Sequence, residues 1–432
     1  MKSLLKRGLS SMSLKIARIA LGMVSTWLLT RWMQQDDFGL YSLALSLSVL
    51  LAIPGEAGIP QFVTREIARK RILGDAPGLR SVVRFANAVV IGLTIITAAA
   101  ACTVLWIGPF DLDRHVSLTI TVVLLAVLLG SLSNTRAGIM RGLGYPLLSQ
   151  VPEQLVRPAA MIALSVAVIF TGTALSATTA ITLYVGASAI AFVFGSALLY
   201  RRLRAVIEPG EVRYDTRAWL GAILPFSLIA GTQVATGQVA TITLGLVRPP
   251  EDVAIFRIAV LIGDLVNLPV LAMGTLLGPQ IVQLFHKGDT AGLQQLVRNA
   301  SRLITAVSLA IFAGIVALGP FVLPFAFGEA YRAAYEPLCV YAGGQLLCAS
   351  TGVVATVASM CDREKLTMVS AILGLGLITA LSLILCPRLG PIGASIAVAA
   401  SMFIAKLALA AVVDQKLSIR TASWWWAPKK QG

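Results

Sequence analysis

Ionisable side chains inside long apolar runs are the residues of this sequence with the clearest potential for chemistry. The run 253–283 contains Arg257, Asp264 and Asn267 at positions i, i+7 and i+10, which places them on one face of a helix. A charge at mid-membrane costs roughly 2.5–3.5 kcal/mol on insertion scales, so it persists where it faces a cavity or a partner. Two interpretations are open: a structural link to a neighbouring helix, or the lining of a transport path.

A second group lies in the run 147–170, where Glu153 and Arg157 are four residues apart, between Pro152 and Pro158. A glutamate one turn before an arginine is the favourable order for an ion pair along a helix. The pair therefore predicts either a contribution to the transport path or mutual neutralisation near the membrane interface.

Further polar positions lie in other apolar runs. Arg18 shares a helical stripe with Lys15 and lies deep enough in the run 12–33 to reach a cavity, whereas Lys15 can extend to the interface. Gln233 belongs to a polar stretch that can hydrogen-bond sugars or hold membrane helices together. Lys406 is a further buried cation in the run 391–413.

Cations outnumber carboxylates among these deep positions, which predicts a substrate with phosphate or carboxylate groups. The carboxylates could instead carry a coupling proton or sodium ion. The predicted cavity residues are Arg18, Arg157, Arg257, Lys406, Gln233 and Asn267, and the candidates for ion coupling are Glu56, Glu153 and Asp264.

The sequence contains no pattern of residues that is typical of a catalytic site or a metal site. The five cysteines form no Cys-x-x-Cys motif, and the two histidines, His115 and His286, lie in separate loops. No metal site or catalytic triad can be assembled from such positions. We expect no catalytic residue, no metal and no cofactor besides a coupling H⁺ or Na⁺.

The elements that position these residues are predicted to be membrane-spanning helices. Hydrophobic residues make up 57% of the 432 and charged residues only 13%. A spanning helix needs about 20 apolar residues, so the composition provides for about twelve spans in an all-α, polytopic membrane protein. The apolar runs are 12–33, 38–63, 85–109, 116–135, 147–170, 178–200, 218–247, 253–283, 303–325, 336–360, 366–386 and 391–413.

Basic residues concentrate in alternate loops, the pattern of the positive-inside rule. This places both termini in the cytoplasm and attributes the net charge of +15 to membrane orientation rather than to nucleic-acid binding. In the basic tail, 414–432, Trp424–Trp426 and Lys429–Lys430 predict an anchor at the membrane surface.

The chain also repeats itself at about half its length. Asp36–Tyr41 aligns with Glu251–Phe256, and Pro54 then falls on Pro269. With one residue deleted, Gly74-Asp75 aligns with Gly288-Asp289. The repeat predicts two parallel bundles of six helices, 1–200 and 218–413, joined by a cytoplasmic linker, 201–217.

Pro54 and Pro269 interrupt the second and eighth spans at matching positions. A broken helix is tolerated where it lines a cavity, so the two prolines predict either a site or a kink inherited with the repeat.

Three segments near the amino terminus resemble the Wzx-type polysaccharide flippases of the multidrug/oligosaccharidyl-lipid/polysaccharide transporter superfamily. They are Leu28–Arg31, Asp37–Ser42 and Gly58–Ala68. The resemblance implies two six-helix bundles around a cavity that opens alternately to each face of a bacterial inner membrane. It also implies an undecaprenyl-pyrophosphate-linked oligosaccharide as substrate, polysaccharide assembly proteins as partners, and an acidic residue at Glu56, two positions before Gly58.

Three other functions compete with this one. A lipid II flippase usually has additional spans, and a drug/cation antiporter needs an acidic, aromatic pocket. A membrane glycan polymerase or ligase needs catalytic residues on a large periplasmic loop, and the outer loops here are short. The sequence therefore favours a transporter over an enzyme.

Overall fold

The computed structural model describes residues 2–56, 58–107, 114–203, 216–361, 363–417 and 419–423, and these residues form helices and turns without a strand. The predicted all-α fold is confirmed. The chain divides into two compact units, which we call the N-terminal unit (Leu9–Gln238) and the C-terminal unit (Val239–Gly432 with Met1–Gly8). The predicted linker, 201–217, and the predicted tail anchor, Trp424–Lys430, lie wholly or mostly outside the described residues and stay predictions.

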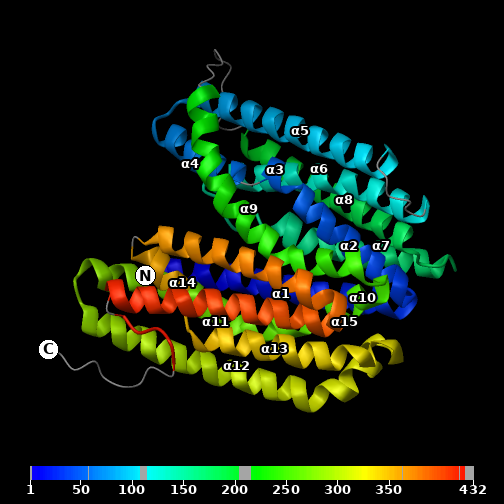
Figure 1. The fold of residues 1–432 in the computed structure, drawn as a ribbon. Coiled ribbons are helices and arrows are strands. Elements are labelled where there is room, and N and C mark those ends of the chain that lie inside the picture. Colours follow the sequence, from blue (N-terminus) through cyan, green and yellow to red (C-terminus); the bar gives the residue numbers. More distant parts are fainter. Residues whose placement is uncertain are drawn as a thin grey trace. The chain divides into compact units, whose positions relative to one another are not determined.

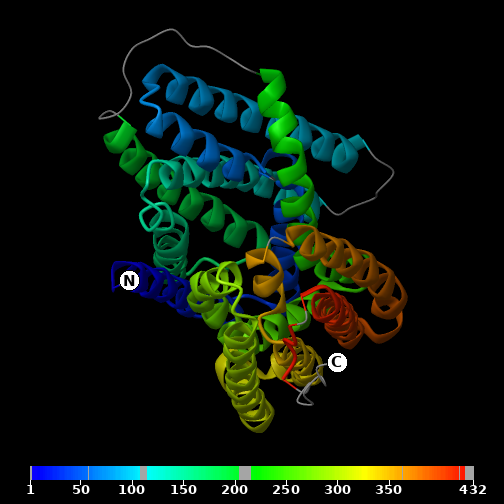
Figure 2. The same cartoon turned by 90° about the vertical axis from the view of Figure 1, so that its left-hand side faces the viewer.

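Long helices of the N-terminal unit run side by side, as α5 does along α6 in Figure 1 and along α4 in Figure 2. A short π-helix, η1, interrupts them. The elements that lie wholly or mostly in this unit are α1 (Lys2–Trp32), α2 (Gln35–Leu51), α3 (Ile53–Glu56), α4 (Ile59–Ile72), α5 (Ala76–Ile107), α6 (Arg114–Gly142), η1 (Pro152–Val156), α7 (Arg157–Phe170), α8 (Ala177–Leu203) and α9 (Thr216–Val247).

The C-terminal unit packs α13 between α12 and α15 (Figure 1). Two short 3₁₀-helices, η2 and η3, lie between its longer elements. The elements are α10 (Pro250–Gly263), η2 (Asp264–Asn267), α11 (Leu268–His286), α12 (Thr290–Phe327), η3 (Glu329–Ala334), α13 (Tyr335–Ser350), α14 (Val354–Met360) and α15 (Glu364–Leu417).

Eight helices among the described residues are long and apolar enough to cross a membrane, and ten spans result when each of two bent helix pairs counts as one. Two further predicted spans lie within longer helices. Gly390 has φ 56° and divides α15, so the runs 366–386 and 391–413 are two helices joined at a kink. The run 12–33 lies in α1, which is helical throughout but is not among the helices counted above.

Close helix packing in the N-terminal unit depends on small residues. Gly138 and Gly142 are one turn apart on α6, and both face α4. A Cβ at Gly138 would lie 2.7 Å from the carbonyl oxygen of Pro60, and Thr64 Oγ1 donates to the Gly138 carbonyl at 3.0 Å. Small residues at this spacing let two membrane helices approach closely. Such packing stabilises their association in lipid, where the hydrophobic effect does not.

The predicted sequence repeat has the same local structure in both units. Gly74 and Gly288 adopt left-handed conformations, with φ 68° and 70°. The following aspartate then caps a helix: Asp75 accepts a bond from the Gly78 N–H, and Asp289 accepts one from the Gly292 N–H, each at 2.8 Å. A glycine turn followed by an N-cap therefore starts α5 and α12 alike, which supports the duplication.

Candidate functional site

A polar cavity of about 410 Å³ lies within the N-terminal unit. Elements α1, α2, α3, α6, η1, α7 and α8 supply its wall. The ionisable residues and amides that line it are Arg18, Glu56, Asn134, Arg141, Gln150, Glu153, Gln154, Arg157 and Tyr184. A second hollow of about 190 Å³ shares Glu56, Asn134 and Arg141 with the first and extends to Ala230 and Val234 of α9.

Glu56 reaches this cavity because the second span is broken. Pro54 has no N–H, so it cannot continue the helical bonding of α2, and it lies in the short helix α3. Gly58 then adopts φ 80° against α9, where a Cβ would lie 2.5 Å from the backbone nitrogen of Ser227. Glu56 lies between Pro54 and Gly58 in this break, and its side chain lines the cavity.

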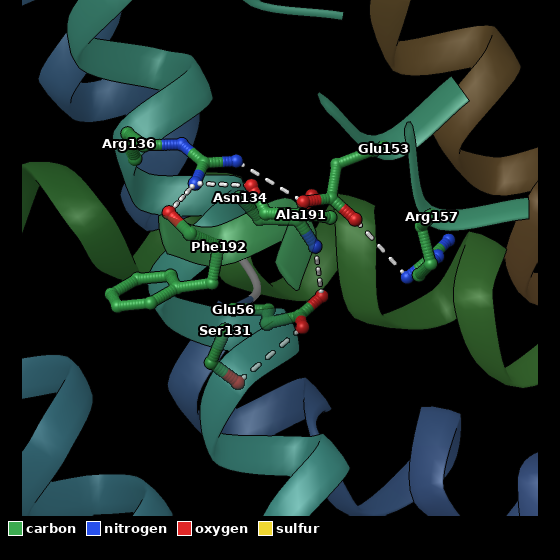
Figure 3. A network of polar contacts seen from close by, with 8 residues as sticks. All are labelled: Glu56, Ser131, Asn134, Arg136, Glu153, Arg157, Ala191 and Phe192. Carbon is green, nitrogen blue, oxygen red and sulfur yellow. Dashed lines mark hydrogen bonds and ion pairs between the residues drawn. The ribbon is translucent and has the colours of Figure 1, made fainter. Parts of the chain in front are cut away.

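Two side chains of α6 hold the Glu56 carboxylate (Figure 3). Asn134 Nδ2 donates to Oε2 at 2.7 Å, and Ser131 Oγ donates to Oε1 at 3.3 Å. Both donors are neutral, and among the described residues no cation bonds this carboxylate. Such a site can take up a proton or a small cation.

Glu153 of the cavity wall bridges two arginines, of which Arg157 lines the cavity and Arg136 does not. Its Oε2 lies 3.1 Å from Arg157 Nη1, and its Oε1 lies 3.1 Å from Arg136 Nη2 (Figure 3). The Arg157 guanidinium also stacks on the Tyr184 ring, 5.6 Å from its centroid. The sequence predicted the pair of Glu153 with Arg157, and the structure adds Arg136 as a third member.

The π-helix η1 explains this arrangement. Pro158 has no N–H to bond the Gln154 carbonyl, and the Arg157 N–H instead bonds the Pro152 carbonyl across five residues. A π turn is wider than an α turn and is frequent at functional sites. The two prolines therefore determine how Glu153, Gln154 and Arg157 enter the cavity.

Sequence reasoning missed several residues in and behind the cavity wall. Asn134 was not among the predicted site residues, and Arg136 and Arg141 lie beyond the apolar run 116–135, although α6 extends to Gly142. A helical stripe in the sequence could have found part of the site: Gly130, Asn134, Ala137 and Arg141 follow i, i+4, i+7 and i+11, and all four line the cavity.

The C-terminal unit contains a second polar group at the break of its own second span. Asp264, in η2, accepts a hydrogen bond from Tyr341 Oη at 2.7 Å and one from Gln345 Nε2 at 3.5 Å. The amide oxygen of Asn267 is buried there without a hydrogen-bond partner. Asp264 thus contacts a neighbouring helix, α13, in the way that the link interpretation expects.

The other predicted residues do not line the cavity of the N-terminal unit. Gln233 lies exposed on α9, Arg257 lies exposed on α10 and Lys406 lies half-buried on α15. Pro269 is the second residue of α11, directly after the 3₁₀ turn η2. Of the nine predicted cavity and coupling residues, the structure brings together Arg18, Glu56, Glu153 and Arg157.

Solved transporter structures share the fold of this chain over nearly its whole length. An inward-facing multidrug resistance MATE family transporter of the MOP superfamily aligns with a TM-score of 0.77 at 14% identity, covering 95% of this chain and 98% of its own. The lipid II flippase MurJ in an inward closed conformation aligns at 0.72 and 13%, covering 94% and 87%. A MOP superfamily transporter from Pyrococcus furiosus aligns at 0.68 and 16%, covering 96% of each chain.

Sequence comparison identifies the family. No curated protein shows significant sequence similarity to the chain. The polysaccharide biosynthesis protein family matches residues 4–285, about two thirds of the chain, which confirms the predicted family resemblance. This multi-pass membrane protein therefore belongs to the polysaccharide biosynthesis protein family and has the fold of the MOP superfamily transporters.

Proposed function

We propose that this protein is a flippase that moves an undecaprenyl-pyrophosphate-linked oligosaccharide across the bacterial inner membrane for surface polysaccharide assembly. Membership of the polysaccharide biosynthesis protein family supports a glycan as part of the substrate. Among the proteins that share the fold, one is itself described as a lipid II flippase, which supports movement of a lipid-linked substrate. Both termini lie in the cytoplasm in this proposal, as the loop charges predict.

The arginine-rich wall of the cavity is the observation that carries the proposal. Arg18, Arg141 and Arg157 line the cavity together with two carboxylates, Glu56 and Glu153. Arg136 also bonds Glu153 from outside the cavity. Guanidinium groups bind phosphate oxygens in pairs of parallel hydrogen bonds, so this wall fits a pyrophosphate headgroup. The same charges repel a cationic drug, which counts against a drug/cation antiporter.

We further propose that ion exchange at Glu56 drives the cycle. The carboxylate is held by Asn134 and Ser131, and no cation of the described part of the chain bonds it, so H⁺ or Na⁺ can bind it when the cavity faces either side. Asp264 is the corresponding candidate in the C-terminal unit, at the break of the matching span.

The test combines a deletion strain with a reconstituted assay. Loss of the gene is expected to leave a lipid-linked glycan on the cytoplasmic leaflet, identified by mass spectrometry, and to remove a surface glycan. Purified protein in liposomes is then expected to move that glycan, and Arg157→Gln to slow the movement strongly at normal protein levels. Unchanged surface glycans together with no accumulated lipid-linked glycan in the deletion strain would refute the proposal.

A further inference from the structure

Arg136 lies behind the wall of the cavity rather than in it. Only 5% of its side chain is exposed. Its guanidinium lies over the ring of Phe192, with Cζ 5.7 Å from the ring centroid. Nη1 donates to the Phe192 carbonyl at 2.8 Å and to the Ala191 carbonyl at 3.4 Å (Figure 3). A buried guanidinium needs a counter-charge as well as hydrogen bonds, and Glu153 provides it.

Helix α8 is shaped to admit this side chain. A Cβ at Gly195 would lie 2.2 Å from Arg136 Cζ, closer than any real contact, so only glycine leaves room for the guanidinium. The carbonyl acceptors and the missing side chain come from the same stretch of α8. Arg136 is thus fixed in one place by α8 and points one nitrogen at Glu153.

Glu153 is consequently shared between two arginines of different exposure. Arg136 is buried, whereas 27% of the Arg157 side chain is exposed, and Arg157 lines the cavity. One carboxylate balances only one of two guanidinium charges. The unbalanced positive charge therefore lies where it can act on a ligand, on Arg157 beside Arg18.

We propose that Arg136 is a positioning residue that keeps Arg157 available to the anionic headgroup of the substrate. By bonding Glu153 from behind, Arg136 prevents that carboxylate from neutralising Arg157 and holds it at the back of the cavity. The inference rests on the proposed function, since it assigns a partner to the phosphate-binding arginine of the same site.

Charge balance provides a test that a purely structural role would fail. Inorganic pyrophosphate is titrated calorimetrically into the full-length protein in detergent micelles. Arg136→Gln is expected to weaken binding about tenfold or more, because Glu153 then neutralises Arg157. Arg136→Gln with Glu153→Gln removes one charge of each sign and is expected to recover most of the affinity.

Three companion variants complete the set. Arg136→Lys keeps the charge and is expected to lie between wild type and Arg136→Gln. Gly195→Ala displaces the guanidinium of Arg136 and is expected to weaken pyrophosphate binding as Arg136→Gln does. It tests the same contact if the Arg136→Gln protein does not fold. Arg298→Gln makes the same exchange on α12, far along the chain from this wall, and is expected to leave affinity unchanged.

The outcomes separate the inference from the function on which it rests. If wild-type protein does not bind pyrophosphate, or if Arg157→Gln leaves binding unchanged, the proposed phosphate site is wrong. If Arg157→Gln weakens binding but Arg136→Gln does not, the role of Arg136 is wrong. If the double variant binds pyrophosphate as weakly as Arg136→Gln alone, the role of Arg136 is likewise wrong, because removing the charge of Glu153 then does not restore the affinity.

Discussion

At the scale of single residues, the cavity combines two carboxylates with contrasting partners. Glu153 has two guanidinium partners, whereas Glu56 has the neutral side chains of Asn134 and Ser131. A carboxylate between two guanidinium groups serves as their counter-charge, whereas one bonded by neutral donors leaves room for a coupling ion. The two acids therefore have different proposed roles: Glu153 as the counter-charge of the arginines, and Glu56 as the candidate for ion coupling.

The first prediction concerns Glu56. Glu56→Gln keeps one of the two oxygens that accept from Asn134 and Ser131 but cannot take up a proton, so movement of the substrate in liposomes should no longer respond to an imposed proton or sodium gradient. The fluorescence of a labelled lipid-linked glycan measures this movement. Asp264→Gln removes the acidic residue of the C-terminal unit and shows whether coupling to the gradient depends on that acid as well. Gradient-dependent movement by Glu56→Gln would exclude Glu56 from coupling.

At the scale of elements, contact between α4 and α6 depends on the absence of side chains at Gly138 and Gly142. Pro60 and Thr64 of α4 present backbone oxygens there, and backbone cannot move aside as a flexible side chain can. Because α6 also supplies Ser131, Asn134 and Arg141, this contact determines where one wall of the cavity lies.

The second prediction uses two matched glycines. Gly138→Ala places a Cβ 2.7 Å from the Pro60 carbonyl oxygen and should lower the thermal unfolding temperature by forcing α4 and α6 apart. Gly92→Ala, on α5, meets no atom within 4 Å and should be neutral or stabilising by up to about 1 kcal/mol, the helix preference for alanine. Thermal unfolding in detergent measures both. Equal unfolding temperatures would show that the close contact is unimportant.

The third prediction concerns the capped turns of the repeat. Asp75→Ala and Asp289→Ala each remove the acceptor of one helix-capping bond and should destabilise the first turn of α5 or α12 by about 1 kcal/mol. Faster amide exchange over residues 76–80 or 290–294 reports the loss, and the intact turn in each variant is the control. Unchanged exchange in both variants would mean that neither cap contributes.

Asp75 adds a pH dependence. The side-chain bond from Lys70 and the Gly78 N–H hold the pKa of Asp75 below its usual range. A depressed pKa means that the contribution of this cap is present at neutral pH and is lost as the pH falls through the lowered pKa. Protection of the first α5 turn should therefore decline only in acid.

At the scale of the whole molecule, the segment 419–423 closes the C-terminal unit. Gln294 of α12 donates to the Arg420 carbonyl at 2.9 Å and accepts from its N–H at 2.8 Å, and the Ser423 N–H bonds the Ser350 carbonyl at 2.9 Å. Thr421 is fully buried in this segment. The segment 419–423 thereby connects α12 with the break between α13 and α14.

The fourth prediction tests that connection. Gln294→Ala removes both bonds to Arg420 and should lower stability by about 1–3 kcal/mol, since two backbone groups lose their partner. Thermal unfolding gives the shift, and increased trypsin cleavage after Arg420 reports release of the segment. Gln295→Ala, at the neighbouring position of the same helix, is the control and should match wild type; cleavage like that of wild type in Gln294→Ala would contradict the connection.

The amino-acid sequence alone was enough to predict the all-α membrane fold, the positions of the spans, the repeat and the family. These follow from local information: about 20 apolar residues form a span, prolines and glycines end helices, and the turns at Asp75 and Asp289 need only neighbouring residues. It also singled out Glu56, Glu153 and Arg157, because an ionisable residue in an apolar run is conspicuous wherever it lies.

Which of these residues share a site depends on the packing of helices that are distant in sequence. The Glu153–Arg157 pair follows from spacing along one helix, but Arg136 joins it from another helix, through the space left by Gly195 of a third. Arg257 and Asp264 look equally functional in the sequence and lie in the other unit. Whether a buried charge lines a cavity depends on which helices pack together, and that packing is a property of contacts distant in sequence.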